Sequence, residues 1–365
     1  MTIPRFMVAA LCVLGPLTCV AHGDGINGEA TYISFSVPGA LGTYPTGINA
    51  SMEVTGYYNV SPTAARGFLR EADGTITTFN VGGATSTQPQ GINAAGDITG
   101  FFYLPAGAAL QGFLRYADGR IITFEGNQAI YQGAQAVSIN DFDEIVGTYT
   151  SRSPSVFTRS RAGVFTTIAV PNGTIATAIN ASGSVVGYYC CDNGVFTGFT
   201  AHPDGYWAGI GISADSGCAN QTIPDAINAA GMIAGWYTNQ YSNDPASCTS
   251  ENIGGFVMSP DGQLTLFQPP GTMPTFHDLA VSTGEVTWPH WVSINQAGDI
   301  TGSYTDTAGV QHGFVRNPYG TITSFDPPEG NQTTTTSIND EGAIAGFYHY
   351  HAGGGPPVGF IRVPQ

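Results

Sequence analysis

Hydrophobic and polar residues alternate along most of this chain in short runs. A run such as "EIVGTY" or "DITGFF" places its apolar residues on one side of an extended strand and its small or polar residues on the other. The runs are separated by glycine, asparagine and aspartate, which are typical turn residues. A helical period of about 3.6 residues is not evident after the N-terminal region. The pattern therefore predicts an all-β protein of short strands and tight turns.

One phrase occurs seven times: "GINASMEVTGYY", "GINAAGDITGFF", "SINDFDEIVGTY", "AINASGSVVGYY", "AINAAGMIAGWY", "SINQAGDITGSY" and "SINDEGAIAGFY". In every copy a glycine follows the asparagine by seven residues. A "GF" pair, a turn glycine and then a phenylalanine or isoleucine recur after most copies. The asparagines are Asn49, Asn93, Asn140, Asn180, Asn228, Asn295 and Asn339.

Each unit is interpreted as four strands, a to d. Strand a ends at "IN", and the following tight turn uses the asparagine to bond its own backbone and glycine to supply a positive φ. Strand b is the alternating "xIxGxY", strand c contains "GF", and strand d resembles "TITTF". A four-stranded unit repeated at about 40 to 50 residues is typical of a β-propeller blade.

The seventh unit lacks its own strand d, because the chain ends soon after the last "GF". The segment "YISFSVPGA" near the N-terminus matches the strand-d sequence "ITSFDPPEG" position by position. We therefore expect this N-terminal strand to complete the last blade and close the ring. The predicted fold is a seven-bladed β-propeller formed by residues 31–365 as one domain, preceded by a short segment at 22–30.

Residues 1–21 have the features of a secretory signal peptide. Arg5 is the charged region, Phe6 to Val20 is the apolar stretch, and Cys19, Val20 and Ala21 form a small-residue cleavage site. The apolar stretch is short for a membrane-spanning helix. Lipid attachment at Cys19 is the alternative, although the preceding residues fit that processing pattern poorly. The sequence thus predicts a protein secreted to the extracellular space or periplasm.

The net charge is −16, and the chain contains no lysine. The absence of lysine excludes Schiff-base chemistry and any lysine nucleophile. Because nucleic-acid binding needs a cationic surface, a strongly acidic chain without a basic cluster argues against it.

The repeated phrase resembles that of the bacterial extracellular HAF-repeat proteins, whose units combine "IN..G.I.G.Y" with a histidine, glycine or alanine, and phenylalanine triplet. The resemblance covers nearly the whole chain after residue 21 and implies an extracellular location and a repeat fold. It implies no catalytic motif. His312 is the one histidine at the triplet position; the other units have Arg66, Gln111, Ser155, Thr197, Gly254 and Val358 there.

Connections b–c and d–a vary in length, whereas the a–b and c–d turns do not. The largest are those between Gly235 and Gly255 and between Phe267 and Asn295. In an up-and-down blade both variable connections emerge on one face, which we call the variable face. Loops on a rigid scaffold often carry function, although unselected drift in loop length gives the same pattern.

Five histidines and two tryptophans lie in or beside the variable connections of blades five to seven. The candidate ligand-binding residues are His277, Asp278, Glu285, Trp288, His290, Trp291, His312, His349, Tyr350 and His351. The tryptophans could stack on a sugar or another flat ligand, or could anchor the long loop. His277, His290, His349 and His351 are candidate ligands for a transition metal, but no established metal-binding spacing is present. No cofactor is predicted.

Four cysteines follow the predicted signal peptide: Cys190, Cys191, Cys218 and Cys248. All fall in connections of blades four and five on the variable face, and an even number in an exported protein indicates disulfides. We favour one bridge from the Cys190/Cys191 pair to Cys218 and another to Cys248. The alternatives are a bridge between the two neighbours with one joining Cys218 and Cys248, or a thiolate metal site.

Two functional hypotheses remain open from the sequence. The first is an exported, monomeric, non-catalytic propeller that binds a ligand, glycan or protein surface through the variable face of blades four to seven. The second is an extracellular propeller enzyme, a polysaccharide hydrolase or lyase or a metal-dependent enzyme, with its site in blades five to seven. A "GxSxG" motif and a glycine-rich phosphate loop are absent. The sequence therefore favours binding over catalysis without deciding between them.

Overall fold

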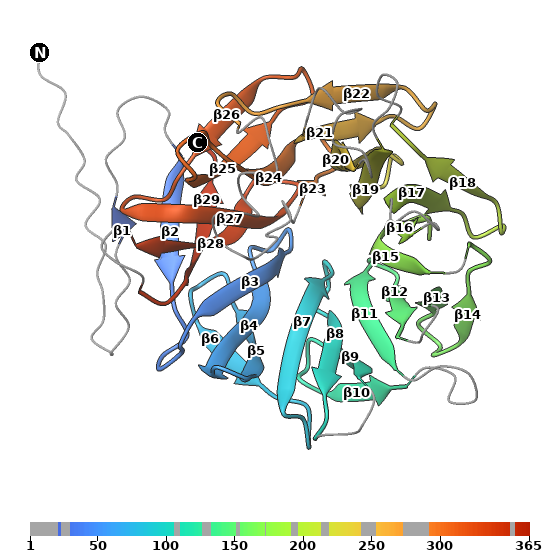
Figure 1. The fold of residues 1–365 in the computed structure, drawn as a ribbon. Coiled ribbons are helices and arrows are strands. Elements are labelled where there is room, and N and C mark those ends of the chain that lie inside the picture. The colour runs from blue at the N-terminus through green and yellow to red at the C-terminus, as the bar shows by residue number, and fades with distance from the viewer. Residues whose placement is uncertain are drawn as a thin grey trace, which may run out of the picture.

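The computed structural model describes residues 21–22, 30–105, 110–125, 133–150, 154–171, 173–190, 196–212, 219–241, 253–272, 292–350 and 355–365. Every regular element in these ranges is a β-strand, and the strands form seven antiparallel sheets. The sheets stand side by side around a central axis, with strand a of each blade innermost (Figure 1). The predicted seven-bladed β-propeller is therefore confirmed.

Each of the first six blades is a four-stranded meander in chain order. Blade one contains β3 (Thr43–Ile48), β4 (Val54–Ser61), β5 (Ala64–Arg70) and β6 (Ile76–Phe79). Blade two contains β7 (Ser86–Ile92), β8 (Ile98–Tyr103), β9 (Gln111–Arg115) and β10 (Ile121–Phe124). Blade three contains β11 (Ala134–Ile139), β12 (Ile145–Tyr149), β13 (Ser155–Arg159) and β14 (Phe165–Thr167). Blade four contains β15 (Thr174–Ile179), β16 (Val185–Cys190), β17 (Phe196–Ala201) and β18 (Trp207–Ile210). Blade five contains β19 (Ala219–Ile227), β20 (Ile233–Tyr241), β21 (Ile253–Met258) and β22 (Leu264–Phe267). Blade six contains β23 (Ser293–Ile294), β24 (Ile300–Thr305), β25 (Gln311–Arg316) and β26 (Ile322–Phe325).

Blade seven joins the two ends of the chain. Its first three strands are β27 (Gly330–Ile338), β28 (Ile344–Tyr350) and β29 (Val358–Val363), and its fourth is the N-terminal β2 (Thr31–Phe35). Strand β2 pairs antiparallel with β29 from Thr31 opposite Val363 to Phe35 opposite Gly359. The short β1 (Ala21–His22) adds to the outer edge of β2. The expected closure by an N-terminal strand is confirmed.

The seven "IN" asparagines form a closed ring of hydrogen bonds between blades. Each side-chain Nδ2 donates to the backbone carbonyl of the asparagine in the next blade, at 2.9–3.3 Å. The last of these bonds runs from Asn339 to the carbonyl of Asn49 at 3.0 Å and so crosses the closure. Each Oδ1 also accepts the backbone N–H four residues further on, as the turn interpretation predicts. The phrase thus specifies both a turn and a contact with the next blade.

The turn residue three places after each asparagine has a positive φ, as expected. It is glycine in five blades, as in Gly96 with φ of 83°. Met52 and Asp143 occupy the same place in blades one and three with φ of 62° and 59°. A side chain in this left-handed region is disfavoured, so the surrounding hydrogen bonds impose the turn even without glycine.

Arginines of strand c pack against phenylalanines of strand d in the preceding blade. Five pairs have the guanidinium carbon 4.8–5.2 Å from the ring centre. The pairs are Arg70 with Phe35, Arg115 with Phe79, Arg159 with Phe124, Arg316 with Phe267, and Arg362 with Phe325. Each cation–π contact contributes roughly 0.5–2 kcal/mol. Half of the ten arginines therefore join neighbouring blades.

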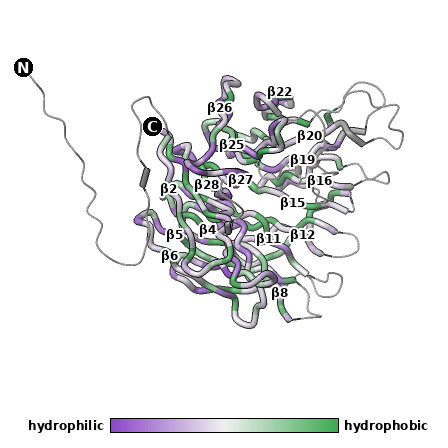
Figure 2. The backbone as a smooth tube through the Cα atoms, turned by 60° about the vertical axis from the view of Figure 1, so that its left-hand side comes forward, coloured by the Kyte–Doolittle hydropathy of each residue, from purple (hydrophilic) through white to green (hydrophobic). Residues whose placement is uncertain are grey.

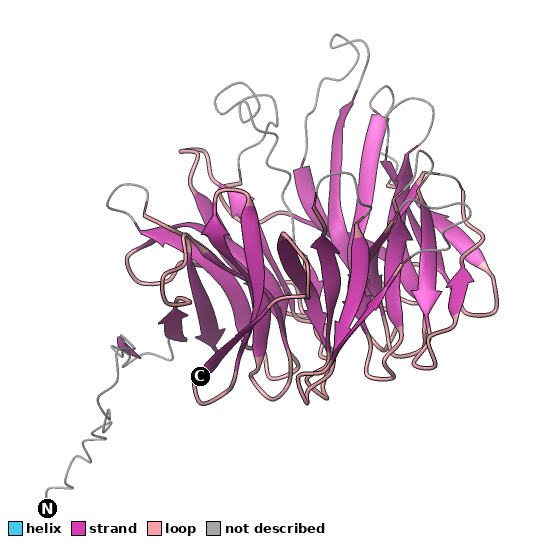
Figure 3. Ribbon diagram, turned by 90° about the horizontal axis from the view of Figure 1, so that it is seen from below, coloured by secondary structure: helices cyan, strands magenta, loops and turns pink. Residues whose placement is uncertain are grey.

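The short turns a–b and c–d lie together on one face of the ring, and the b–c and d–a connections leave from the other (Figure 3). Hydrophobic and hydrophilic segments alternate along the strands (Figure 2), as expected where buried layers separate the blades. The described part of the chain contains no helix that is both long and apolar enough to cross a membrane.

Candidate functional site

The innermost strands carry a β-bulge at a fixed place, three residues before the "IN" asparagine. Each bulge inserts one unpaired residue into strand a, and a bulge re-aims the side chain that it carries. The bulged residues are Thr46, Gln90, Val137, Thr177, Asp225 and Thr336. Val292 has the corresponding place in blade six, directly before β23.

A central cavity of about 460 Å³ lies where these seven residues meet. All seven line it, and with them the innermost strand of every blade. Its volume falls in the range of sites for small organic molecules, about 300–1,000 Å³. The six bulges, together with Val292 in blade six, therefore place one side chain per blade at a shared internal space.

Asp225 is the one charged residue among the described residues that line the central cavity. Its Oδ2 accepts a hydrogen bond from the backbone N–H of Val292, at 3.3 Å. Burial raises the pKa of the Asp225 carboxyl to about 8, and the hydrogen bond from Val292 opposes this shift. The side chain is deep inside the ring, and its remaining accessible surface faces the cavity.

Aromatic side chains surround the same side of the central cavity. Tyr188 of β16, Phe196 at the start of β17 and Trp236 of β20 all line it, and the rings of Tyr188 and Phe196 meet edge to face at 5.2 Å. Burial raises the pKa of Tyr188, and the negative charge of Asp225 raises it further. The cavity thus combines one carboxyl group with an aromatic wall on blades four and five.

Two other bulge residues, Thr46 and Thr177, use their polar atoms differently from Asp225. The hydroxyl of Thr46 donates to the carbonyl of Pro89 at 3.1 Å, and that of Thr177 to the carbonyl of Pro224 at 2.7 Å. Both contacts join one blade to the next. Asp225 shows a different contact: its Oδ2 accepts from the backbone N–H of Val292 in the next blade.

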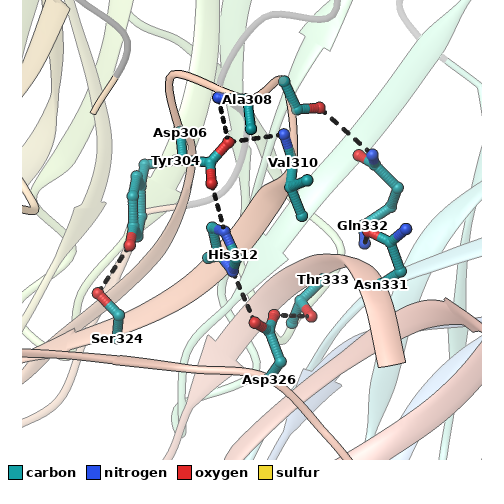
Figure 4. A network of polar contacts seen from close by, with 11 residues as sticks. Tyr304, Asp306, Ala308, Val310, His312, Ser324, Asp326, Asn331, Gln332 and Thr333 are labelled. Atoms are coloured by element: carbon teal, nitrogen blue, oxygen red, sulfur yellow. Dashed lines mark hydrogen bonds and ion pairs between the residues drawn. The ribbon is translucent and has the colours of Figure 1, made fainter. Parts of the chain in front are cut away.

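A second polar cluster surrounds His312 in blades six and seven (Figure 4). The Nδ1 of His312 lies 2.6 Å from Asp326 Oδ2, and the Nε2 of His312 lies 3.2 Å from Asp306 Oδ2. Asp306 accepts backbone N–H groups in the β24–β25 turn, while Asp326 accepts the Thr333 hydroxyl of blade seven. The imidazole therefore links a turn of blade six to the first strand of blade seven.

Both ring nitrogens of His312 face carboxylates, so the protonated ring is the form that fits this cluster. Partial burial lowers the pKa of His312, but the hydrogen bonds and charges of Asp326 and Asp306 outweigh it, and the pKa is raised. Neither nitrogen presents a lone pair to a metal or a substrate. His312 thus has a structural role in this arrangement.

Replacing His312 with Gln is expected to change how stability depends on pH. A raised pKa means that the stabilisation is complete below about 6.5, the ordinary value for histidine, and is lost as pH rises through the raised value. The contribution is about 1 kcal/mol or less, because the cluster is partly exposed. Urea unfolding from pH 5 to 9 measures it as the difference between wild type and His312→Gln. A difference that does not change with pH would contradict the ionic role.

The other candidate residues from the sequence do not line the central cavity within the described residues. His349 and Tyr350 end β28, and Tyr350 packs on Tyr348 and lies in a groove beside Pro356 between blades seven and one. The remaining candidates lie outside the described residues: His277, Asp278, Glu285, Trp288, His290, Trp291 and His351.

Most residues of the metal and disulfide predictions also lie outside the described residues. The described part of the chain contains no group of three histidine, cysteine or acidic residues placed to hold a metal ion. Cys190 is the last residue of β16, whereas Cys191, Cys218 and Cys248 lie outside the described residues. The disulfide pairings therefore stay predictions.

Asp225 is not among the site residues predicted from the sequence, although the sequence contains a pattern that distinguishes it. Aligning the seven phrases three positions before the asparagine gives Thr, Gln, Val, Thr, Asp, Val and Thr. One charged residue stands in a column that is otherwise neutral. What the sequence could not reveal is that this column faces the axis, because an unbulged strand would have placed it differently.

Comparisons with known proteins support the fold. No family model matches the chain, and no curated protein matches it either. An ancestral GH74 enzyme is 12% identical, with 93% of this chain and 50% of that chain covered and a TM-score of 0.52. TolB from Acinetobacter baumannii is 11% identical over 82% of this chain and 76% of that chain, with a TM-score of 0.44. The six-bladed Aleuria aurantia lectin is 13% identical over 77% of this chain and 94% of that chain, with a TM-score of 0.41. The chain spans half the length of the GH74 enzyme, and at this identity the likeness concerns the fold alone.

Proposed function

We propose that this protein is an exported, monomeric propeller that binds a small organic ligand in the central cavity, with Asp225 as its polar anchor. The observation that carries the proposal is the placement of Asp225. Burial of a carboxyl group is unfavourable, and the equivalent residues of the other blades show that the fold accepts neutral side chains there. A destabilising group at a site where a neutral one suffices is typical of a functional residue.

Binding is a better interpretation of this lining than hydrolysis. Glycoside hydrolysis commonly needs two carboxyl groups on either side of the bond, and the described lining of the central cavity offers Asp225 alone. A cavity with mainly apolar walls and few polar groups is instead typical of a small-molecule site.

The proposed site is compatible with access from the variable face. Phe196 begins β17 directly after the b–c connection of blade four, and Val292 precedes β23 directly after the d–a connection from blade five. Both line the central cavity. Ligand entry over blades four to six would then involve the connections whose lengths differ most.

Filling the central cavity should abolish binding without unfolding the ring. Val137 lines the cavity from blade three, and no polar contact of its side chain is lost on substitution. We expect Val137→Trp to occupy the space and Val137→Ala to leave it open. In a thermal-shift screen of small molecules, a ligand at about 100 times its Kd stabilises by ~2.7 kcal/mol. Such shifts should occur for wild type and Val137→Ala and disappear for Val137→Trp.

Circular dichroism and melting without ligand would show whether Val137→Trp still folds. Should it fail to fold, Val292→Phe tests the same space from blade six. Ligand-induced shifts that persist in a folded, cavity-filled variant would place binding elsewhere and overturn the proposal.

A further inference from the structure

The described lining of the central cavity contains one acidic group and no basic one. Asp225 is its one charged residue, and the chain as a whole has no lysine and a net charge of −16. The described arginines have other places, five of them stacked on phenylalanines between blades. The protein therefore supplies no counter-ion for Asp225 from the described walls.

We infer that the ligand is a small organic cation, an ammonium group on an apolar or aromatic body, whose charge is neutralised by the Asp225 carboxylate. This inference rests on the proposed function and specifies the class of ligand. An ammonium group is the chemical complement of a buried carboxylate that lacks a counter-ion.

The geometry around Asp225 suits both parts of such a ligand. Oδ2 is held by Val292 N–H at 3.3 Å, which fixes the carboxylate while its other oxygen can accept from an ammonium group. Tyr188, Phe196 and Trp236 line the same side, and aromatic faces attract a cation by about 0.5–2 kcal/mol each. Ile175 and Ile223 continue the wall and can cover the apolar body.

The strong negative charge of the whole molecule also favours a cationic ligand. A protein with a large excess of acidic groups attracts cations at long range and repels anions. An anionic ligand would have to overcome both this field and the carboxylate inside the cavity.

Ligand charge and the protonation of Asp225 are coupled. Tyr188 is the one other titratable group that lines the described cavity, and β15, β20 and β23 contribute Thr177, Trp236 and Val292 there. Because the pKa of the Asp225 carboxyl is raised to about 8, the empty cavity holds a neutral acid at pH 6. A cation binds the ionised form, so its affinity should rise by about tenfold per pH unit up to that value. A neutral ligand that accepts a hydrogen bond from the acid would bind with constant affinity below this pKa and more weakly above it.

The test compares tryptamine with tryptophol, which has a hydroxyl group in place of the ammonium group. Calorimetry with wild type, Val137→Trp and Asp225→Asn from pH 6 to 9 gives the affinities, and aliphatic ammonium groups stay charged over most of this range. Two smaller pairs, benzylamine with benzyl alcohol and cyclohexylamine with cyclohexanol, cover ligands of other sizes. We expect each amine that binds to do so at least about tenfold more tightly than its alcohol at pH 8.

Asp225→Asn should remove this preference and the pH dependence while leaving the alcohols unaffected. The variant should also melt several degrees above wild type at pH 9, and this difference should shrink progressively toward pH 4, because the unfolded carboxyl ionises near its ordinary pKa of about 4 whereas the buried one keeps its proton up to about pH 8. That shift verifies that the variant folds and that the residue is ionised inside the ring.

Three outcomes would overturn the inference: no amine binds, amines and alcohols bind alike, or Asp225→Asn binds amines as well as wild type does. If small molecules still stabilise wild type and not Val137→Trp, the central cavity remains the binding site and only the ligand class is wrong. If Val137→Trp does not affect any ligand, the proposed function fails as well.

Discussion

Deleting Tyr32 to Pro38 should open the ring and give a species that aggregates or exchanges strands. The deletion removes most of β2 and exposes the hydrogen-bonding edge of β29. It also removes Phe35, which is buried against Phe68 and Ile361 and stacks under Arg70 of blade one. Loss of a buried phenylalanine alone costs about 3–5 kcal/mol, and an unpaired strand edge promotes association. Light scattering after size exclusion and calorimetric melting would measure both effects.

A variant that begins at Ala30 is the matched control for this deletion. It lacks β1 but keeps β2, so it should stay monomeric and melt close to the full protein. A synthetic peptide of residues 31–40, added to the deleted protein, should restore the monomer by supplying the missing strand. A deleted protein that remains monomeric with an unchanged melting temperature would refute closure by β2.

The sequence allowed the blade and the ring to be predicted because the same local rules are stated seven times. Alternation, the asparagine turn and the recurring glycines each require only neighbouring residues, and repetition separates them from chance. Even the closing strand followed, since Phe35 aligns with Phe325 in a segment that the last unit lacks.

Contacts between blades could not be predicted in the same way. The bond from Asn339 to the carbonyl of Asn49 joins residues at opposite ends of the chain, and the stacking of Arg70 on Phe35 depends on the distance between two sheets. Repetition shows that an arginine recurs, but not what it touches. Local spacing carries no information on either contact until the ring is assembled.

The candidate site was even harder to predict from local sequence spacing than the contacts between blades. The histidines and tryptophans of the long connections were predicted to bind a ligand because their side chains can bind metals or stack on sugars. Asp225 was not predicted, because it lies in an inner strand that repeats six other times. Its importance arises from the bulge and from the meeting of seven strands around one space. A departure from a repeat at an inward position is therefore as informative as an unusual loop.

The glycine of strand b should tolerate no side chain, and Gly100 is the sharpest case. A Cβ at Gly100 would lie 2.2 Å from the carbonyl oxygen of Gln88 and 2.8 Å from Cα of Pro89. Both atoms belong to the backbone of β7, the innermost strand of the same blade, so neither can rotate away. The glycines at this place in five other blades meet strand a at a similar distance: Gly56, Gly147, Gly187, Gly235 and Gly346. The recurrence of glycine thus reflects close packing of two strands rather than a turn.

Gly100→Val should therefore cost about 3 kcal/mol or more, the upper end of the range for overpacking. Gly302 has the same place in β24, and Gly302→Val should behave alike. Gly82→Val is the matched control, because a Cβ at Gly82 has no atom within 4 Å and its φ is not positive. Urea unfolding of the three variants measures the free energies, and β-propensity alone would favour valine over glycine at a strand position. If Gly100→Val unfolded at the same urea concentration as Gly82→Val, the close approach of β7 and β8 would not be what keeps glycine in the phrase.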